Sequence, residues 1–195
     1  MTGRTLVAGV GNIFLGDDGF GVAVARRLAE APLPDRVTVA DYGTSGVHLA
    51  YDLADRYDTA ILIDAAPRGQ QPGTITVLEI EPEHRALPES GGTVETGRLL
   101  DGHGMQPDLV LGMLGLLGAK AGRILVVGCE PGSTGYRIGL SDAVAAAVDE
   151  AVRIVLDLVS GEAGQDLSGE LAAAPTARDV SGEHEGMSHV PRHSG

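Results

Sequence analysis

Two neighbouring acidic residues, Asp17 and Asp18, lie in the glycine-rich stretch GVGNIFLGDDGFG at residues 9–21. Such a stretch between a strand and a helix is where many α/β proteins bind phosphates. Here Phe14 occupies the sixth fingerprint position, where a dinucleotide loop has glycine, and no Gly-Lys-Ser or Gly-Lys-Thr sequence follows. A carboxylate at this place repels a phosphate, whereas the dipole of a helix N-terminus stabilises it. The loop therefore favours a cation, although either acid could instead cap the helix that begins near Gly19.

Further acidic residues stand where other strand-like segments end, namely Asp41, Asp64 and Glu130. Parallel strands point the same way, so the residues that follow them gather along one edge of the sheet, where ligands of α/β proteins bind. Asp64 ends the apolar run AILID, and a partly buried acid there needs a metal, a basic group or backbone donors as its partner. Asp41 and Glu130 fit a turn-bracing role as well as a functional one.

His103 is the histidine best placed to join these acids, because it stands in the glycine-flanked loop LLDGHGMQPDLV just before a helical pattern. Two carboxylates and an imidazole make a site with open positions, suited to nickel, zinc, iron or manganese rather than to calcium. A metal held in this way polarises a carbonyl group and lowers the pKa of a bound water to about 7. Cys129 ends a buried strand beside no obvious base, so it is interpreted as a core residue.

The segments that must position these residues alternate between strand and helix patterns. The pattern of apolar residues and the local composition predict strands at residues 5–10, 37–42, 59–65, 74–80 and 123–129. They predict helices at residues 18–30, 44–55, 107–118 and 141–159, the last starting at a Ser141 cap. The alternation indicates the α/β class, as a three-layer α/β/α sandwich with a mostly parallel sheet of about five strands. The 74–80 segment follows its predecessor too closely for a helical crossover, so it is expected to be antiparallel or at an edge.

Length and composition indicate one folded domain over residues 1–160. The chain has 195 residues, 43% of them hydrophobic, and 29 glycines, which suits buried parallel strands joined by tight turns. Residues 161–195 mix Gly, Ser, Pro and charge without an apolar period, and we expect a disordered tail there.

Charge and cysteine content narrow the classes of partner and the location. A formal net charge of −13 argues against nucleic-acid binding, which needs clustered Lys and Arg. The single cysteine excludes internal disulfides, and the N-terminus has no secretory pattern. No apolar run reaches the roughly 20 residues that a membrane-spanning helix needs. We therefore expect a cytoplasmic protein with no membrane partner.

Five motifs in the same order resemble those of the hydrogenase maturation proteases, which remove a C-terminal peptide from the large subunit of nickel–iron hydrogenases. They are GVGNIFLGDDGFG, DYGTSG, LIDAA, DGHGMQPD and VVGCEPG. The resemblance covers residues 4–159 and implies a metal-dependent endopeptidase. None of the five motifs lies in the tail.

The resemblance also implies which residues form the site. Metal binding and catalysis fall on three residues, Asp18, Asp64 and His103. Substrate binding falls on the turn after the second strand and on the other acid of the first motif, which are Asp17, Asp41, Gly43 and Thr44. Relatives can carry Glu where this chain has Asp18, so Asp17 remains an alternative metal ligand.

In the mechanism that the resemblance implies, the nickel belongs to the substrate. A nickel-loaded large-subunit precursor is the partner, the enzyme has no permanently bound cofactor, and it is expected to be a monomer. A noncatalytic maturation chaperone that senses the inserted metal would need the same three ligands, and remains the alternative. A nucleotide-binding protein of the same fold would be stabilised by NAD or ATP, which we do not expect.

Overall fold

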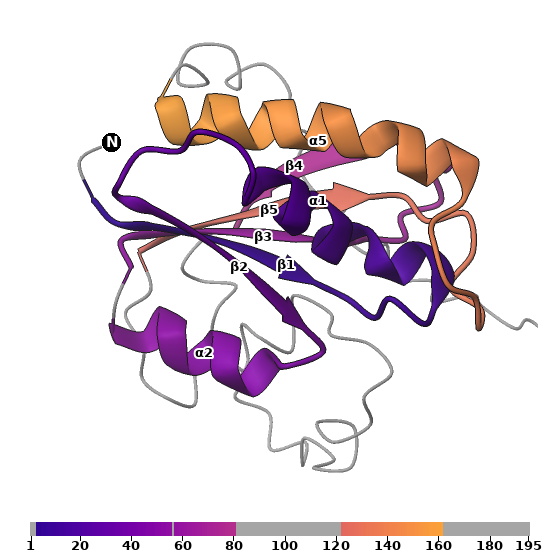
Figure 1. The fold of residues 1–195 in the computed structure, drawn as a ribbon, viewed down its shortest axis with the longest axis horizontal. Helices are drawn as coiled ribbons and strands as arrows, with labels where there is room; N and C mark the ends of the chain where they lie inside the picture. The colour runs from indigo at the N-terminus through magenta and orange to yellow at the C-terminus, as the bar shows by residue number, and fades with distance from the viewer. Residues whose placement is uncertain (1–2, 56, 81–121, 162–195) are drawn as a thin grey trace, which may run out of the picture.

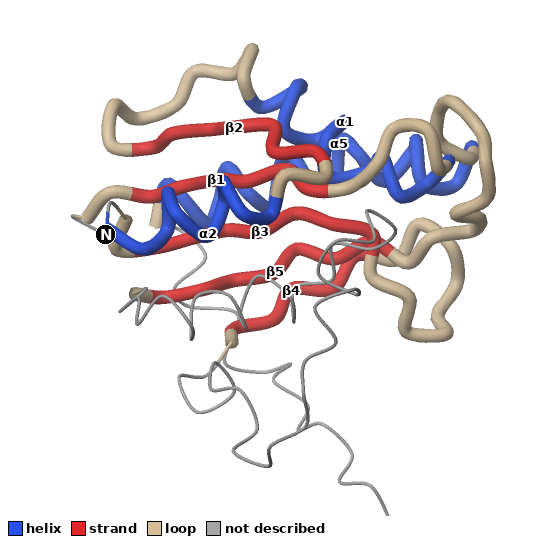
Figure 2. The backbone as a smooth tube through the Cα atoms, turned by 90° about the horizontal axis from the view of Figure 1, so that it is seen from below, coloured by secondary structure: helices blue, strands red, loops and turns tan. Residues whose placement is uncertain are grey.

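A five-stranded sheet with the order β2-β1-β3-β5-β4 forms the centre of the molecule (Figure 2). The computed structural model describes residues 3–55, 57–80 and 122–161. The strands are β1 (Thr5–Val10), β2 (Val37–Gly43), β3 (Thr59–Ala65), β4 (Ile75–Glu79) and β5 (Arg123–Cys129). The first three strands and β5 run parallel, while β4 pairs antiparallel with β5 at the edge. The short connection before β4 thus gives both of the expected features.

Helices cover both faces of this sheet, which gives the three layers seen in Figure 1. They are η1 (Gly16–Gly19), a single 3-10 turn, followed by α1 (Phe20–Leu28), α2 (Gly46–Asp55) and α5 (Asp142–Ser160). Helices α1 and α5 lie together on one face, and α2 lies on the other (Figure 1). The predicted α/β class and its layered arrangement are confirmed. No helix in the described part of the chain combines the length and apolar character needed to cross a bilayer.

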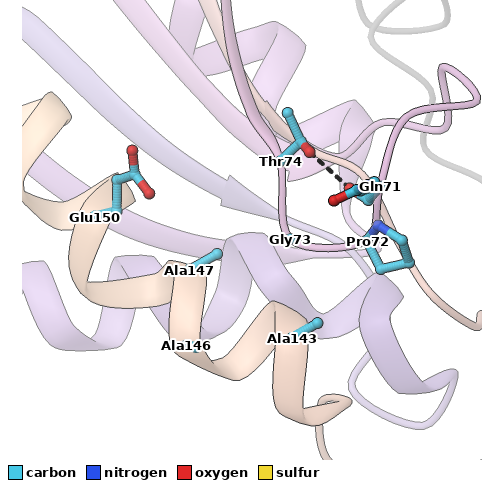
Figure 3. A pocket seen from close by; sticks show the side chains of 8 residues that line it. All are labelled: Gln71, Pro72, Gly73, Thr74, Ala143, Ala146, Ala147 and Glu150. Carbon is cyan, nitrogen blue, oxygen red and sulfur yellow. Dashed lines mark hydrogen bonds between the residues drawn. The ribbon is translucent and has the colours of Figure 1, made fainter.

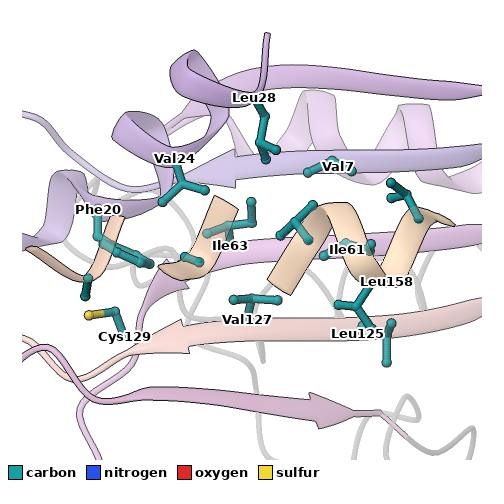
Figure 4. Packing of buried hydrophobic residues seen from close by; sticks show 14 of the residues in the cluster. Val7, Phe20, Val24, Leu28, Ile61, Ile63, Leu125, Val127, Cys129 and Leu158 are labelled. Carbon is teal, nitrogen blue, oxygen red and sulfur yellow. The ribbon is translucent and has the colours of Figure 1, made fainter. Parts of the chain in front are cut away.

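Two apolar clusters hold the layers together. The larger one fills the space between the sheet and helices α1 and α5, with Phe20, Ile63 and Val127 among its buried members (Figure 4). The smaller one packs Leu49 and Leu53 of α2 against the opposite face of the sheet. Strand β1 is buried along its whole length, because it lies inside the sheet and under both layers. The central strands therefore form a rigid base for whatever follows their carboxyl ends.

Some sequence-based predictions differ from the structure or fall outside it. Ser141 is the N-cap residue of α5, but its side chain makes no capping hydrogen bond; instead its hydroxyl donates to the carboxylate of Asp17 at 2.9 Å. Neither Asp17 nor Asp18 caps α1, whose N-cap is Gly19. The helix predicted at residues 107–118 and the tail predicted at 161–195 lie outside the described residues, apart from Gly161.

The first turn of α1 lies unusually close to the sheet. A β-carbon added to Gly21 would overlap the carbonyl oxygens of Val10, at the end of β1, and of Ile63 in β3. Only a glycine allows this approach, since every other residue carries that carbon. The close approach brings the turn before α1, which carries Asp18, to the end of β3, where Asp64 lies.

The Gly21→Ala variant tests this contact. It should lower the free energy of unfolding by about 3 kcal/mol, the upper end for overpacked cores, because both obstructing atoms belong to the backbone. Urea denaturation measures the change. Gly135→Ala is the matched control, since its added carbon comes no closer than 3.7 Å to another atom. Equal stabilities for the two variants would contradict the close approach.

Candidate functional site

The candidate site lies where the order of the strands along the sheet reverses. The connection through α1 leads from β1 outward to β2, whereas β3 lies on the other side of β1. The carboxyl ends of β1 and β3 therefore border the point where the strand order reverses, which is the usual ligand position of an open α/β sheet. Asp18 follows β1, and Asp64 is the penultimate residue of β3.

Asp18 and Asp64 come together at this point. Gly11 lies between them, because a β-carbon there would overlap the carbonyl oxygen of Asp18 and lie 3.7 Å from Oδ1 of Asp64. The Asp64 side chain is buried, with 4% of the residue exposed, and its Oδ1 accepts a hydrogen bond from the Ala65 N–H at 2.8 Å. Asp18 is half-buried, and its Oδ2 accepts one from the Asn12 N–H at 2.7 Å. The loop thus folds over its own glycine and brings Asp18 to the end of β3, close enough for its charge to act on the Asp64 carboxyl group.

The electrostatics of this pair favour a cation. Burial raises the pKa of Asp64 well above its ordinary value, the negative charge of Asp18 raises it further, and the Ala65 hydrogen bond only partly opposes them. A divalent ion between the carboxylates would remove the repulsion and replace the lost solvation. Among the described residues no third His, Cys, Asp or Glu completes a group that could hold an ion. His103, the predicted third ligand, lies outside the described residues, so its place in the site stays a prediction.

Asp17 points away from its neighbour Asp18 and is 1% exposed. Its carboxylate accepts four hydrogen bonds from the loop between β5 and α5. The donors are the Gly132 N–H at 2.8 Å, the Ser133 N–H at 2.9 Å, the Ser141 N–H at 2.6 Å and the Ser141 hydroxyl at 2.9 Å. Burial alone would raise the pKa of Asp17, but these hydrogen bonds outweigh it and the pKa is lowered. The structure therefore gives Asp17 the role of fastening two loops, and its predicted substrate contact stays a prediction.

The end of β2 and the residue after it border the same site. The Gly11 N–H donates to the Gly43 carbonyl at 2.9 Å, and the Gly43 N–H donates to Oδ1 of Asp41 at 3.0 Å. Oδ2 of Asp41 lies 3.2 Å from Nη2 of Arg26, while Thr44 is exposed. The residues expected to bind substrate thus adjoin the loop of Asp18, and their role stays a prediction.

Glu130 and Cys129 lie at the end of β5 without an evident chemical role. Glu130 is buried and accepts hydrogen bonds from the N–H groups of Arg68 and Gly69, at 2.6 and 3.3 Å, so it braces the turn after β3. Cys129 is fully buried in the larger cluster, as interpreted from the sequence. Burial, followed by the charge of Asp17, raises the pKa of the Cys129 thiol to about 12, which leaves it protonated and unreactive.

A shallow hollow of about 390 Å³ lies elsewhere, between the turn before β4 and helix α5 (Figure 3). Its lining is small or polar, with Pro72, Thr74 and Ala146 among its residues, and Glu150 at one end is its single charged group. The hollow contains neither acid of the pair. The chemistry of the chain therefore points to the ends of β1 and β3.

Comparison with known proteins shows the family to which the chain belongs. The family model for hydrogenase maturation proteases matches residues 22–158. The chain belongs to the hydrogenase maturation protease family. The Hydrogenase 2 maturation protease of Escherichia coli K12 is 34% identical over 155 residues, which cover 78% of this chain and 88% of that protein. A putative hydrogenase maturation protease of Methanocaldococcus jannaschii is 32% identical over 155 residues, with 77% and 93% covered.

A solved structure supports the same assignment. The hydrogenase maturating endopeptidase HybD from Escherichia coli superposes with a TM-score of 0.62 at 29% identity, covering 82% of this chain and 94% of that one. Nucleotide-binding proteins of the same architecture place a phosphate at the loop after the first strand. In this chain the carbonyl of Asp18 itself occupies the space over Gly11.

Sequence reasoning missed a group of exposed apolar residues near this site. Phe14, Tyr136 and Ile138 are 61%, 87% and 79% exposed. The sequence offered only its composition as an indication of these residues. The chain has two phenylalanines and four tyrosines, and one of each lies in a glycine-rich loop.

The Asp17→Ala variant tests the fastening of the two loops. It leaves three backbone N–H groups without their acceptor, each at a cost of about 1–3 kcal/mol when buried. We expect the free energy of unfolding to fall by about 3 kcal/mol in chemical denaturation. Asp149→Ala removes an exposed carboxylate that pairs with Arg27, and should change stability by less than about 1 kcal/mol. A loss no greater than this control would rule out the fastening role.

The Asp64→Asn variant tests the raised pKa in the metal-free protein. Folded wild type holds a proton on Asp64 above pH 3.8, where the unfolded chain releases it, so wild-type stability falls as pH rises through this window. The asparagine lacks this penalty, so the variant should gain stability over wild type as the pH rises above 3.8. Thermal unfolding with a chelator present measures the difference. Asp35→Asn, at an exposed position, should show no such trend; a pH-independent difference at Asp64 would contradict the shift.

Proposed function

We propose that this protease is an endopeptidase that removes the C-terminal extension of a nickel-loaded nickel–iron hydrogenase large-subunit precursor and recognises it by its nickel. The observation that carries the proposal is the pair of carboxylates, Asp18 and Asp64, at the strand-order reversal. Membership of the maturation protease family supports the reaction class and the kind of substrate. The nickel is part of the substrate, so no resident cofactor is needed.

In this proposal the two carboxylates and His103 contact the nickel that the precursor carries. Without a metal ion the Asp18–Asp64 pair is electrostatically unfavourable, because the buried Asp64 is close to the negative charge of Asp18. A divalent ion relieves this strain only when it arrives with the substrate, so a precursor without nickel binds without that gain. The net charge of −13 adds a long-range attraction for a partly exposed cation.

Hydrolysis then follows next to the recognised metal. A water adds its oxygen to the scissile carbonyl carbon, the carbon–nitrogen bond breaks, and the proton ends on the leaving amine. A metal ion at this place polarises the carbonyl or the water. The carboxylates of Asp18 and Asp64 would hold and orient the ion, and the positive charge of the ion would stabilise the negative charge that develops on the carbonyl oxygen. Asp41, Gly43 and Thr44 contribute surface for the precursor, and the enclosed Asp17 holds the neighbouring loops in place. The enzyme acts as a monomer in the cytoplasm.

Incubation with a nickel-loaded precursor tests the proposal. The wild-type enzyme should lower the mass of the precursor by the mass of its C-terminal extension. A precursor without nickel should stay intact. Asp64→Asn and His103→Ala should abolish cleavage while remaining folded. Asp149→Asn, which changes an exposed acid on α5, should cleave like wild type. Binding of the loaded precursor without any mass change would instead identify a noncatalytic chaperone.

A further inference from the structure

Three large apolar side chains stand out from the surface beside the candidate site. Phe14, Tyr136 and Ile138 are 61%, 87% and 79% exposed, and we call them the apolar platform. They come from two loops that are far apart in the sequence, one after β1 and one after β5. Grouped exposure of large apolar residues, aromatic ones above all, is typical of binding surfaces.

Backbone hydrogen bonds join the two loops at the platform itself. The Arg137 N–H donates to the Phe14 carbonyl at 3.0 Å, and the Gly16 N–H donates to the Arg137 carbonyl at 2.8 Å. Leu15 and Arg137 form a parallel bridge between them. The backbone of Phe14 is therefore held beside that of Tyr136 and Ile138, the two residues that flank Arg137.

The carboxylate of Asp17 fixes the same two loops from inside. Its bonds to Gly132, Ser133 and Ser141 fasten both ends of the loop that carries Tyr136 and Ile138. A backbone held in this way loses little further freedom when a partner binds, so the contact surface is preorganised. The platform thus has the rigidity of a recognition surface.

The position of the platform indicates its occupant. Asn12 links Phe14 to the acid pair, because its Oδ1 accepts from the Phe14 N–H at 3.0 Å and its own N–H donates to Oδ2 of Asp18 at 2.7 Å. A polypeptide bound on the platform is therefore close to Asp18. A second copy of this chain is a poor occupant, because each copy carries a formal net charge of −13 and repels the other. A polypeptide whose metal centre is docked at Asp18 and Asp64 fits, since its neighbouring residues are already close.

We propose that the apolar platform binds an apolar stretch of the precursor polypeptide adjacent to its metal centre, and so supplies affinity that the acid pair alone does not. This inference rests on the proposed function for the identity of the substrate. It assigns Phe14, Tyr136 and Ile138 to substrate binding, and leaves the chemical step to the acidic site.

The double variant Phe14→Ser with Tyr136→Ser tests the platform. Its KM for nickel-loaded precursor, and its Kd measured by calorimetry, should rise about tenfold or more, as expected when exposed aromatic anchors are removed. Its kcat should stay close to the wild-type value. Tyr51→Ser is the matched control, because Tyr51 is also 61% exposed but lies on α2. Both proteins should keep the wild-type thermal midpoint.

Each further outcome bears on a different claim. Wild-type cleavage with an unchanged KM in the double variant overturns the platform and leaves the proposed function intact. Loss of precursor binding in the double variant, when wild type binds but does not cleave, supports the platform and overturns the protease function. A wild-type dimer that the substitutions dissociate, seen by sedimentation, identifies a second copy as occupant and overturns the inference.

Discussion

The proximity of two like charges is the interaction on which the site depends. Asp64 lies near the end of the buried strand β3. The turn before α1 brings Asp18 close to it, because Gly21 lets the helix approach the carbonyls of Val10 and Ile63. Burial and repulsion make the metal-free pair unfavourable, as the raised pKa of Asp64 indicates. The buried central strands and the two apolar clusters supply the stability that offsets this local cost.

Adjacent acids in one short turn have different roles, because their environments differ. Asp17 is enclosed and satisfied by four donors from the loop after β5, so its charge stabilises the fold. Asp18 is half-exposed and faces a second carboxylate, so its charge is available for a cation. The hydrogen bonds of Asp17 also hold the backbone that presents Phe14 and Tyr136. One buried carboxylate thereby connects the acidic site to the apolar platform.

Much of the architecture could be predicted from local pattern. The strands at residues 5–10, 59–65 and 123–129 are mostly apolar runs, which is typical of parallel strands that are covered on both faces. The edge position of β4 followed from a connection too short for a helix. Asp18 and Asp64 could be placed at one edge because parallel strands end together. The partners of Asp17 could not be predicted, since they lie 115–124 residues away.

The amino-acid sequence by itself determined the fold class, the parallel strands and the presence of acids at their carboxyl ends, because these depend on periodicity and on the direction of strands. Only the tertiary structure decided which acid of the Asp17–Asp18 pair is enclosed and which faces Asp64. It also decided that the Ser141 hydroxyl donates to the distant carboxylate of Asp17 and accepts no capping hydrogen bond from its own helix. The physical reason is that hydrogen bonding and desolvation depend on neighbours in space, and loop packing brings those neighbours together.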